Sequence, residues 1–281
     1  MKALFYRVED DKVICDLCPH HCVMKNNMYG LCHTRQNINN ELIANSYGKI
    51  SSMALDPIEK KPLYHFFPGS YILSVGSYGC NMKCQFCQNY TISQQICPTI
   101  NVSAQELVNR ALAEKNNIGI AFTYNEPTLS YEYMLDVCAL TKGSKLKIVI
   151  VSNGMIEHEP LKKLISYVDA FNIDLKAFTE HFYMKNGGNI QQVKENIAYI
   201  FKAGKHLEIT TLIIPNENDS DEEIEKLCQW IAQISPNIPL HLSRFFPRYK
   251  MLNTPPTPEK TLFRLYEIAK KFLKYVHLGN I

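Results

Sequence analysis

The chain has 281 residues, of which 46% are hydrophobic and 20% are charged, and its formal net charge is +3 at pH 7. Such a chain can bury a sizeable core as one large domain with a small addition. The near-neutral charge gives no reason to expect nucleic acid or an anionic membrane as a partner. No apolar run could span a bilayer, and the N-terminus is charged where a signal peptide is apolar, so we expect a cytoplasmic protein.

Ten cysteines are present, and seven of them fall in two tight clusters with the spacing of metal ligands. This distribution favours a reducing compartment over a set of disulfides. We expect the remaining three, Cys97, Cys138 and Cys228, to behave as small apolar residues.

The first cluster has the spacing C-x2-C-x3-C-x9-C and is formed by Cys15, Cys18, Cys22 and Cys32. A segment this short cannot fold on its own hydrophobic core, and a bound metal would supply the folding free energy. We therefore predict that residues 1–40 form a metal-binding segment. Zinc on four thiolates is the first choice and an auxiliary iron–sulfur cluster the second. Because the cysteines fill four positions, three histidines are expected outside the ligand set: His20, His21 and His33.

Residues 41–70 are expected to be a connector that wraps the core of the protein. The stretch from Asp56 to Gly69 is rich in proline, charge and aromatic residues, which predicts irregular structure. Two interpretations stay open. The stretch either lays charged side chains against the functional site or keeps them in water, and the residues concerned are Glu59, Lys60, Lys61 and His65.

The second cluster has the spacing C-x3-C-x2-C and is formed by Cys80, Cys84 and Cys87, directly after an apolar strand expected at 71–76. Four cysteines would close a zinc or [4Fe–4S] site. Three thiolates leave one iron of a cubane without a protein ligand, open to a small molecule. A labile zinc site and a chance pattern are the alternatives.

From residue 100 onward, apolar runs alternate with helical patterns. After the strand at 71–76, further strands are expected at 118–123, 147–151, 170–175, 208–214 and 239–243. Helices are expected at 129–141, 160–167, 190–201 and 259–275, and capping boxes at Ser103 and Ser220 predict two more. Strands that alternate with helices form parallel sheets with right-handed crossovers. We therefore predict an α/β fold in which residues 71–281 form a partial (β/α)6-type, TIM-like barrel.

In such a barrel the active site lies at the carboxyl ends of the strands. Each apolar run of this chain ends in polar residues, which six separate core strands have no reason to share. The candidates at these ends are Asn125, Glu126, Ser152, Asn153, Asp174, Lys176, His241 and Arg244.

The C-x3-C-x2-C loop, with Phe86 before its last cysteine, resembles that of the radical S-adenosylmethionine (SAM) superfamily. The sequences CDLCPHHC, DPIEKKPLYHF, Gly79-Cys-Asn and Gln88-Asn-Tyr-Thr-Ile-Ser93 resemble the radical SAM members of the AmmeMemoRadiSam system, relatives of pyruvate formate-lyase activating enzymes. This resemblance covers most of the chain and implies a radical SAM core at 71–281.

The resemblance also implies which strand ends hold SAM. Asn125 and Glu126 stand where the family has a Gly-Gly-Glu-Pro-like segment at the methionine ammonium, although Tyr124 and Asn125 replace the glycines here. Ser152 and Asn153 resemble the SNG segment that reaches the ribose or carboxylate. Asp174 and Lys176 resemble the DLK segment, with the lysine at the SAM carboxylate, and His241 resembles a histidine near the adenosyl group. Ordinary alternatives are a helix cap, a turn, a salt bridge and a structural histidine.

By the same resemblance the three thiolates hold a [4Fe–4S] cluster whose open iron binds SAM. An electron from a flavodoxin or ferredoxin-type reductant cleaves SAM to a 5′-deoxyadenosyl radical, which abstracts hydrogen from an unidentified small-molecule or protein substrate. An activating enzyme that installs a glycyl radical on a partner protein is the alternative. A non-enzymatic metal-binding module is a distant third, since it leaves the polar strand ends unexplained.

Overall fold

A computed structural model describes residues 1–281. Its main sheet contains the six predicted strands, all parallel: β8 (Tyr71–Gly76), β10 (Asn117–Phe122), β11 (Lys147–Ser152), β12 (Ala170–Asp174), β13 (His206–Ile213) and β14 (Leu240–Arg244). The order β15-β14-β13-β12-β11-β10-β8-β7 is linear, so the sheet is open. Sequence reasoning missed both edges, namely the parallel strand β15 (Val276–Gly279) and the antiparallel strand β7 (Ser52–Pro57).

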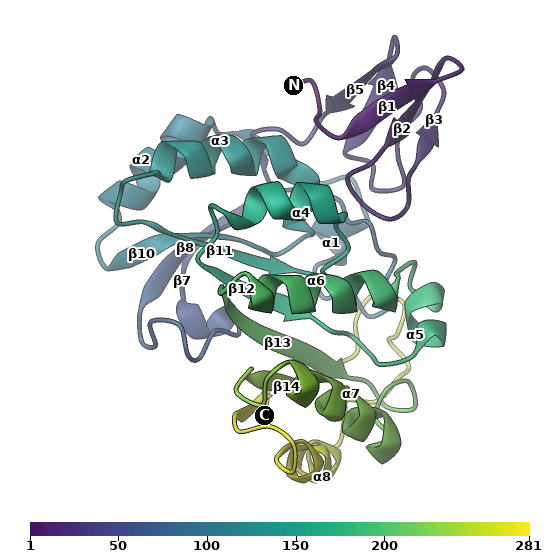
Figure 1. The fold of residues 1–281 in the computed structure, drawn as a ribbon, viewed down its shortest axis with the longest axis vertical. Helices are drawn as coiled ribbons and strands as arrows, with labels where there is room; N and C mark the ends of the chain where they lie inside the picture. The colour runs from purple at the N-terminus through teal and green to yellow at the C-terminus, as the bar shows by residue number, and fades with distance from the viewer.

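Helices connect the parallel strands and lie along one side of the sheet (Figure 1). They are α2 (Ala104–Ala113), α3 (Tyr131–Thr141), α4 (His158–Ile165), α6 (Ile190–Lys202), α7 (Asp221–Ile234) and α8 (Glu259–Ala269). Short helical segments complete the core: Ile58–Lys60, α1 (Tyr90–Ser93), Pro127–Ser130 and α5 (Glu180–Lys185). None of the helices combines the length and apolar character needed to cross a membrane.

The last helix is shorter than its apolar pattern predicts. It ends at Ala269, and a turn follows in which Phe272 and Leu273 donate backbone hydrogen bonds to Ala269. This turn lets Val276 pair with Leu240 as the first residue of β15. Pairing with the sheet edge therefore prevailed over continuation of the helix.

One of the two predicted capping boxes is complete. Ser103 Oγ accepts from Glu106 N at 3.2 Å, and the Glu106 carboxylate accepts from Ser103 N at 2.7 Å. At the other helix Ser220 Oγ accepts from Glu223 N at 3.2 Å, but the Glu223 carboxylate accepts from Phe178 N at 2.6 Å instead. Tertiary contact thus replaces the second half of the predicted box.

The N-terminal cysteines lie in a small antiparallel module at one end of the molecule (Figure 1). One sheet contains β1 (Tyr6–Glu9), β2 (Lys12–Cys15) and β3 (Val23–Met24), and a hairpin contains β4 (Arg35–Ile38) and β5 (Glu41–Ala44). Arg35 and Glu132 of α3 join the module to the core, with Nη2 at 2.8 Å from both carboxylate oxygens. Both side chains are buried.

The region 41–70 is more regular than predicted. It contains β5, β6 (Lys49–Ile50) and β7, and β6 pairs with β9 (Ile100–Asn101). The expectation of irregular structure is wrong at Asp56 and Pro57, which pair with Ile72 and Tyr71. Proline is tolerated there because β7 is an edge strand. Residues 61–70 form turns, as predicted.

Candidate functional site

A cavity of about 600 Å³ lies at the carboxyl ends of the parallel strands. It is lined by all three cysteines of the second cluster and by all seven residues proposed from the sequence to contact SAM: Cys80, Cys84, Cys87, Asn125, Glu126, Ser152, Asn153, Asp174, Lys176 and His241. The carboxyl ends of the parallel strands thus bring together residues that are spread from position 80 to position 241 of the sequence.

Strand β8 delivers the cysteine loop through a tight turn. Gly79 has φ +83°, and a Cβ on it would lie 2.6 Å from Cys32 O, so only glycine fits. Asn125 braces the same turn: its Nδ2 donates to Tyr78 O at 3.0 Å and Gly79 O at 3.1 Å, and its Oδ1 accepts from Ser77 N at 3.0 Å. Asn125 therefore acts on the loop that carries the first cysteine.

The three thiols of the loop fit a cluster site. Cys80 Sγ accepts weak hydrogen bonds from Met82 N at 3.4 Å and Asn153 Nδ2 at 3.6 Å. Burial raises the pKa of Cys84 to about 11, partly offset by Lys176. Burial raises the pKa of Cys80 and Cys87 as well. Bound iron would displace their protons, which is how metal binding couples to thiol ionisation.

The Glu126 carboxylate accepts four hydrogen bonds inside the protein. Oε1 accepts from Thr128 N at 3.1 Å, Thr128 Oγ1 at 2.7 Å and Ser152 Oγ at 2.8 Å, and Oε2 accepts from Asn153 N at 2.9 Å. Burial raises its pKa, while these donors oppose the rise. Glu126 thus caps the short helix Pro127–Ser130, which is the helix-cap role that the sequence allowed as an alternative to SAM binding. The same carboxylate still lines the cavity.

Asp174 and Lys176 form an ion pair within the cavity wall, with Nζ 2.8 Å from Oδ2. Burial opposes the charge on Lys176, but Asp174 and the Cys84 thiolate outweigh it and raise the pKa of the lysine. Lys176 is therefore a fixed cation beside the cysteine loop. Its backbone N–H donates to Tyr183 Oη at 3.0 Å, which holds the end of β12.

His241 is tied to a buried carboxylate that the sequence did not reveal. Its Nε2 lies 2.6 Å from Glu208 Oε2, and Glu208 also accepts from the backbone N–H groups of Tyr64 and His65 at 3.0 and 2.8 Å. The hydrogen bonds from His206 and His241 outweigh the cost of burial and lower the pKa of Glu208 to about 2. An ionised Glu208 accepts a hydrogen bond from the Nε2–H group of His241.

Two other candidates do not line the cavity. Arg244 donates to Thr257 O and Glu259 Oε1, both at 2.8 Å, so its guanidinium makes a local ion pair. His65 Nε2 lies 2.8 Å from His277 Nε2. Of the four connector residues considered, Glu59, Lys60 and Lys61 line the cavity.

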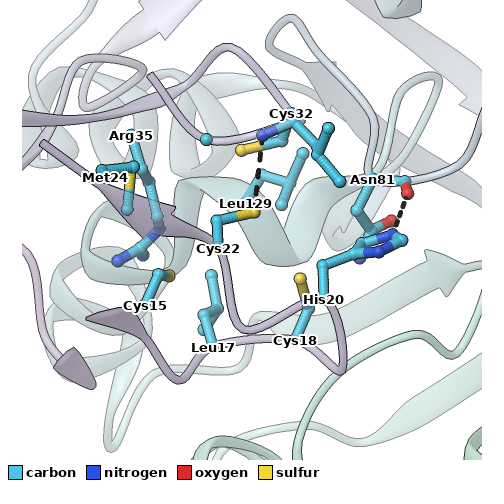
Figure 2. A pocket seen from close by; sticks show the side chains of 12 residues that line it. Cys15, Leu17, Cys18, His20, Cys22, Met24, Cys32, Arg35, Asn81 and Leu129 are labelled. Carbon is cyan, nitrogen blue, oxygen red and sulfur yellow. Dashed lines mark hydrogen bonds between the residues drawn. The ribbon is translucent and has the colours of Figure 1, made fainter. Parts of the chain in front are cut away.

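The four N-terminal thiols line a second, smaller cavity, shown in Figure 2. Burial raises the pKa of Cys15 to about 11 and that of Cys18 to about 12. Nowhere in residues 1–281 are three or more His, Cys, Asp or Glu side chains arranged to hold a single metal ion. The four predicted cysteines therefore line one cavity, but their thiols are not arranged as the ligands of a single metal ion.

This small cavity adjoins the cysteine loop of the core. His20 Nε2 donates to Asn81 O at 2.6 Å, as Figure 2 shows, and Asn81 directly follows Cys80. Asn81 also holds Asn153, whose Nδ2 lies 2.9 Å from Asn81 Oδ1. The role of His20 is thus to contact the loop, in agreement with its expected place outside the ligand set.

The family model described as "Radical SAM superfamily" matches residues 74–231, which is more than half of the chain. The chain therefore belongs to the radical SAM superfamily, an enzyme family whose cofactors are a [4Fe–4S] cluster and SAM. The residues that line the large cavity fall largely within the matched range.

Two relatives come from Methanocaldococcus jannaschii. The chain is 40% identical over 286 residues to uncharacterized protein MJ0808, covering 100% of this chain and 85% of that protein. It is 30% identical over 209 residues to putative glycyl-radical enzyme activating enzyme MJ1632, covering 71% and 77%. A solved radical SAM methyltransferase from Sphaerobacter thermophilus matches with TM-score 0.58 and 16% identity over 76% of this chain and 67% of that chain, which shows the fold alone.

Proposed function

We propose that Cys80, Cys84 and Cys87 hold a [4Fe–4S] cluster and that SAM binds beside it in the large cavity. The supporting observation is that one cavity of about 600 Å³ is lined by the three thiols, by the Glu126 carboxyl group and by the amine of Lys176. When bound, the cluster would supply the electron that cleaves SAM to methionine and a 5′-deoxyadenosyl radical. That radical would abstract hydrogen from a small-molecule or protein substrate.

The protein's own share is to orient SAM and to exclude water. Lys176 suits the carboxylate of the methionine portion and Glu126 its ammonium, since charge-assisted hydrogen bonds are the strongest available. Ser152 Oγ and Asn153 N donate to the Glu126 carboxylate, and Asp174 fixes Lys176. His241, held by Glu208 through Nε2, is proposed to lie at the adenosyl group. Asn125, which supports the cysteine turn and lines the cavity, is proposed to contact SAM.

A second metal is proposed at Cys15, Cys18, Cys22 and Cys32. The buried Nε of Arg35 lacks a hydrogen-bond partner, and Arg35 lines the same small cavity. Four thiolates on one Zn²⁺ carry net negative charge, which a buried guanidinium would compensate. Zinc is preferred, and an auxiliary iron–sulfur cluster is the alternative. Closing the site requires the thiols to move together, which we expect metal binding to drive.

The electron donor is proposed to be a flavodoxin or ferredoxin-type protein, and the location is proposed to be the cytoplasm. Membership of the AmmeMemoRadiSam group, based on the stretch DPIEKKPLYHF, likewise remains a proposal. The substrate is a small molecule or a protein.

A second function is favoured by one relative, whose name describes a glycyl-radical enzyme activating enzyme. In that case the hydrogen donor would be a backbone glycine of a partner protein. Incubation of the reduced protein with SAM and a glycyl radical enzyme, followed by electron paramagnetic resonance, separates the two functions. A backbone glycyl radical supports activation, and its absence supports another substrate.

The cofactor proposal is tested by titrating SAM into protein reconstituted anaerobically with iron and sulfide. We expect saturable binding that requires the cluster, at roughly one SAM per cluster, and a change in the charge-transfer absorbance of the iron–thiolate bonds as SAM binds. A cluster-loaded protein that does not bind SAM would contradict the proposal and favour a metal-binding module.

A further inference from the structure

The connector forms part of the cavity wall and contacts Tyr124 and His241 there. Six of its residues line the cavity: Pro57, Glu59, Lys60, Lys61, Pro62 and Tyr64. The short helix Ile58–Lys60 ends there, and Lys61 N donates to Ile58 O at 2.9 Å. The wall therefore has a defined backbone, and its side chains are available for substrate.

Lys61 is the unusual member of this wall because its side chain is only 3% exposed while it still lines the cavity. Its Nζ donates to Asp56 Oδ2 at 2.8 Å and lies 4.6 Å from the centre of the Tyr124 ring. An ammonium group has three donors, and no other hydrogen bond of Nζ is formed. The amine is thus buried, partly unsatisfied and directed by two fixed neighbours.

The Lys61 amine is also desolvated. Burial lowers the pKa of Lys61, and the neighbouring Lys60 lowers it further, although Asp56 opposes both. A desolvated lysine next to another cation is the arrangement that makes an amine nucleophilic near neutral pH.

A network of hydrogen bonds around Asp56 holds the amine in place. Asp56 Oδ2 accepts from both Lys61 Nζ and Tyr124 Oη, the latter at 2.6 Å, and Oδ1 accepts from Lys60 Nζ at 3.3 Å. Tyr124 is held in a left-handed conformation, φ +73°, where it packs against Gly76. A Cβ on Gly76 would lie 2.9 Å from the Tyr124 ring, so the two residues fit together only with glycine at that position.

We propose that Lys61 forms a Schiff base with an aldehyde or ketone substrate in this cavity, where Asp56 and the Tyr124 ring hold its amine. The Lys61 ammonium loses a proton to water, and the amine adds to the carbonyl carbon. The new C–N bond gives a carbinolamine when a proton passes from the nitrogen to the oxygen. Loss of that oxygen as water leaves the protonated imine, and nothing is oxidised or reduced. The inference rests on the proposed function, because the captured carbonyl compound would be the substrate of the same cavity.

The test is reductive trapping on the reconstituted protein under anaerobic conditions at pH 7. Sodium cyanoborohydride is added with pyruvate in one arm and glyceraldehyde in the other, and peptide mass spectrometry locates the adducts. Pyruvate probes a 2-oxo acid and glyceraldehyde a neutral aldehyde. We expect Lys61 to be modified at least about tenfold more than the exposed Lys226 in one arm, because burial lowers the pKa of Lys61 whereas Glu222 raises the pKa of Lys226.

Two variants sharpen the test. Lys61→Arg keeps a buried cation and should lose the adduct at position 61, whereas Lys60→Met removes the exposed neighbour and should reduce trapping at Lys61 several-fold. Modification of Lys61 no greater than that of Lys226 in both arms would overturn the proposal. Trapping needs neither SAM nor an electron, so its success or failure is independent of whether SAM is cleaved.

Discussion

The two cysteine sites of this protein lie side by side and differ in what surrounds them. Cys80, Cys84 and Cys87 open into a cavity of about 600 Å³ with charged walls, whereas the N-terminal thiols enclose a small, mostly apolar space. One site has three thiols and room for a ligand; the other has four and room for little more than a metal. Thiol number and free volume together distinguish a reactive site from a structural one.

The N-terminal module contacts the cysteine loop of the core. His20 donates to the backbone of Asn81, and Gly79 packs without a side chain against Cys32. Both contacts act on the turn that carries Cys80. The N-terminal module thus supports the cysteine loop from the side opposite to the cavity, and folding of the module should affect how well that loop is ordered.

The largest expected effect comes from breaking the open site. Cys84→Ala should abolish SAM cleavage and the iron–thiolate absorbance, because two thiolates cannot hold a cubane in place. The measurement is 5′-deoxyadenosine formed per chain after dithionite reduction. Cys97→Ala, which removes a cysteine outside both sites, is the control and should retain cleavage. Nucleoside formation by the Cys84 variant would refute the assignment of these ligands.

Breaking the closed site should have a different result. Cys18→Ala should remove one metal per chain and lower the free energy of unfolding by about 3 kcal/mol or more, while the cluster at the other site still assembles. Metal counting and anaerobic chemical unfolding measure the two effects. A Cys18 variant with unchanged metal content and unchanged stability would show that the N-terminal thiols bind nothing.

The third prediction concerns the buried ion pair between Arg35 of the N-terminal module and Glu132 of the core. Arg35→Met leaves the buried Glu132 carboxylate without its partner, and breaking such a pair costs about 3–5 kcal/mol. The double variant Arg35→Met/Glu132→Leu, which removes both charges, should recover a large part of this loss. Chemical unfolding decides, and a double variant no more stable than Arg35→Met would contradict the ion-pair explanation.

The smallest effect concerns SAM itself. Glu126→Gln should weaken SAM binding about tenfold, or about 1.4 kcal/mol, because a charge-assisted contact becomes a neutral one. Glu106→Gln on α2 is the matched control outside the cavity, and it should leave the affinity for SAM unchanged. Equal affinities for both variants in a SAM titration would mean that Glu126 serves only as the cap of the helix that follows it.

Much of this arrangement could be predicted from sequence because its signals are local. The spacing of Cys80, Cys84 and Cys87 predicts the cysteine loop, and alternating apolar runs predict the six parallel strands. Strand ends then place Asp174 and Lys176 at the same cavity. Strand β15 has only four residues, and β7 precedes the helix–strand alternation as an antiparallel strand, so the pairing of both depends on tertiary contact.

The groups that sequence reasoning missed interact over long separations. Glu208 binds His241 and the backbone of residues 64 and 65, and Asp56 binds Tyr124, but a single sequence does not reveal such pairs. Lys61 appeared only as one of several charges in a proline-rich stretch. The signal that could have singled it out is the run of two lysines before Pro62, where the preceding helical turn must end.

The most direct test of the account is the amount of 5′-deoxyadenosine formed by the reconstituted protein with SAM and dithionite, with iron and zinc counted in the same sample. We predict nucleoside from protein that holds about four irons and one zinc per chain. About eight irons with nucleoside would assign an iron–sulfur cluster to the N-terminal thiols. No nucleoside from a protein that carries its cluster and binds SAM would contradict the proposal that this cavity cleaves SAM.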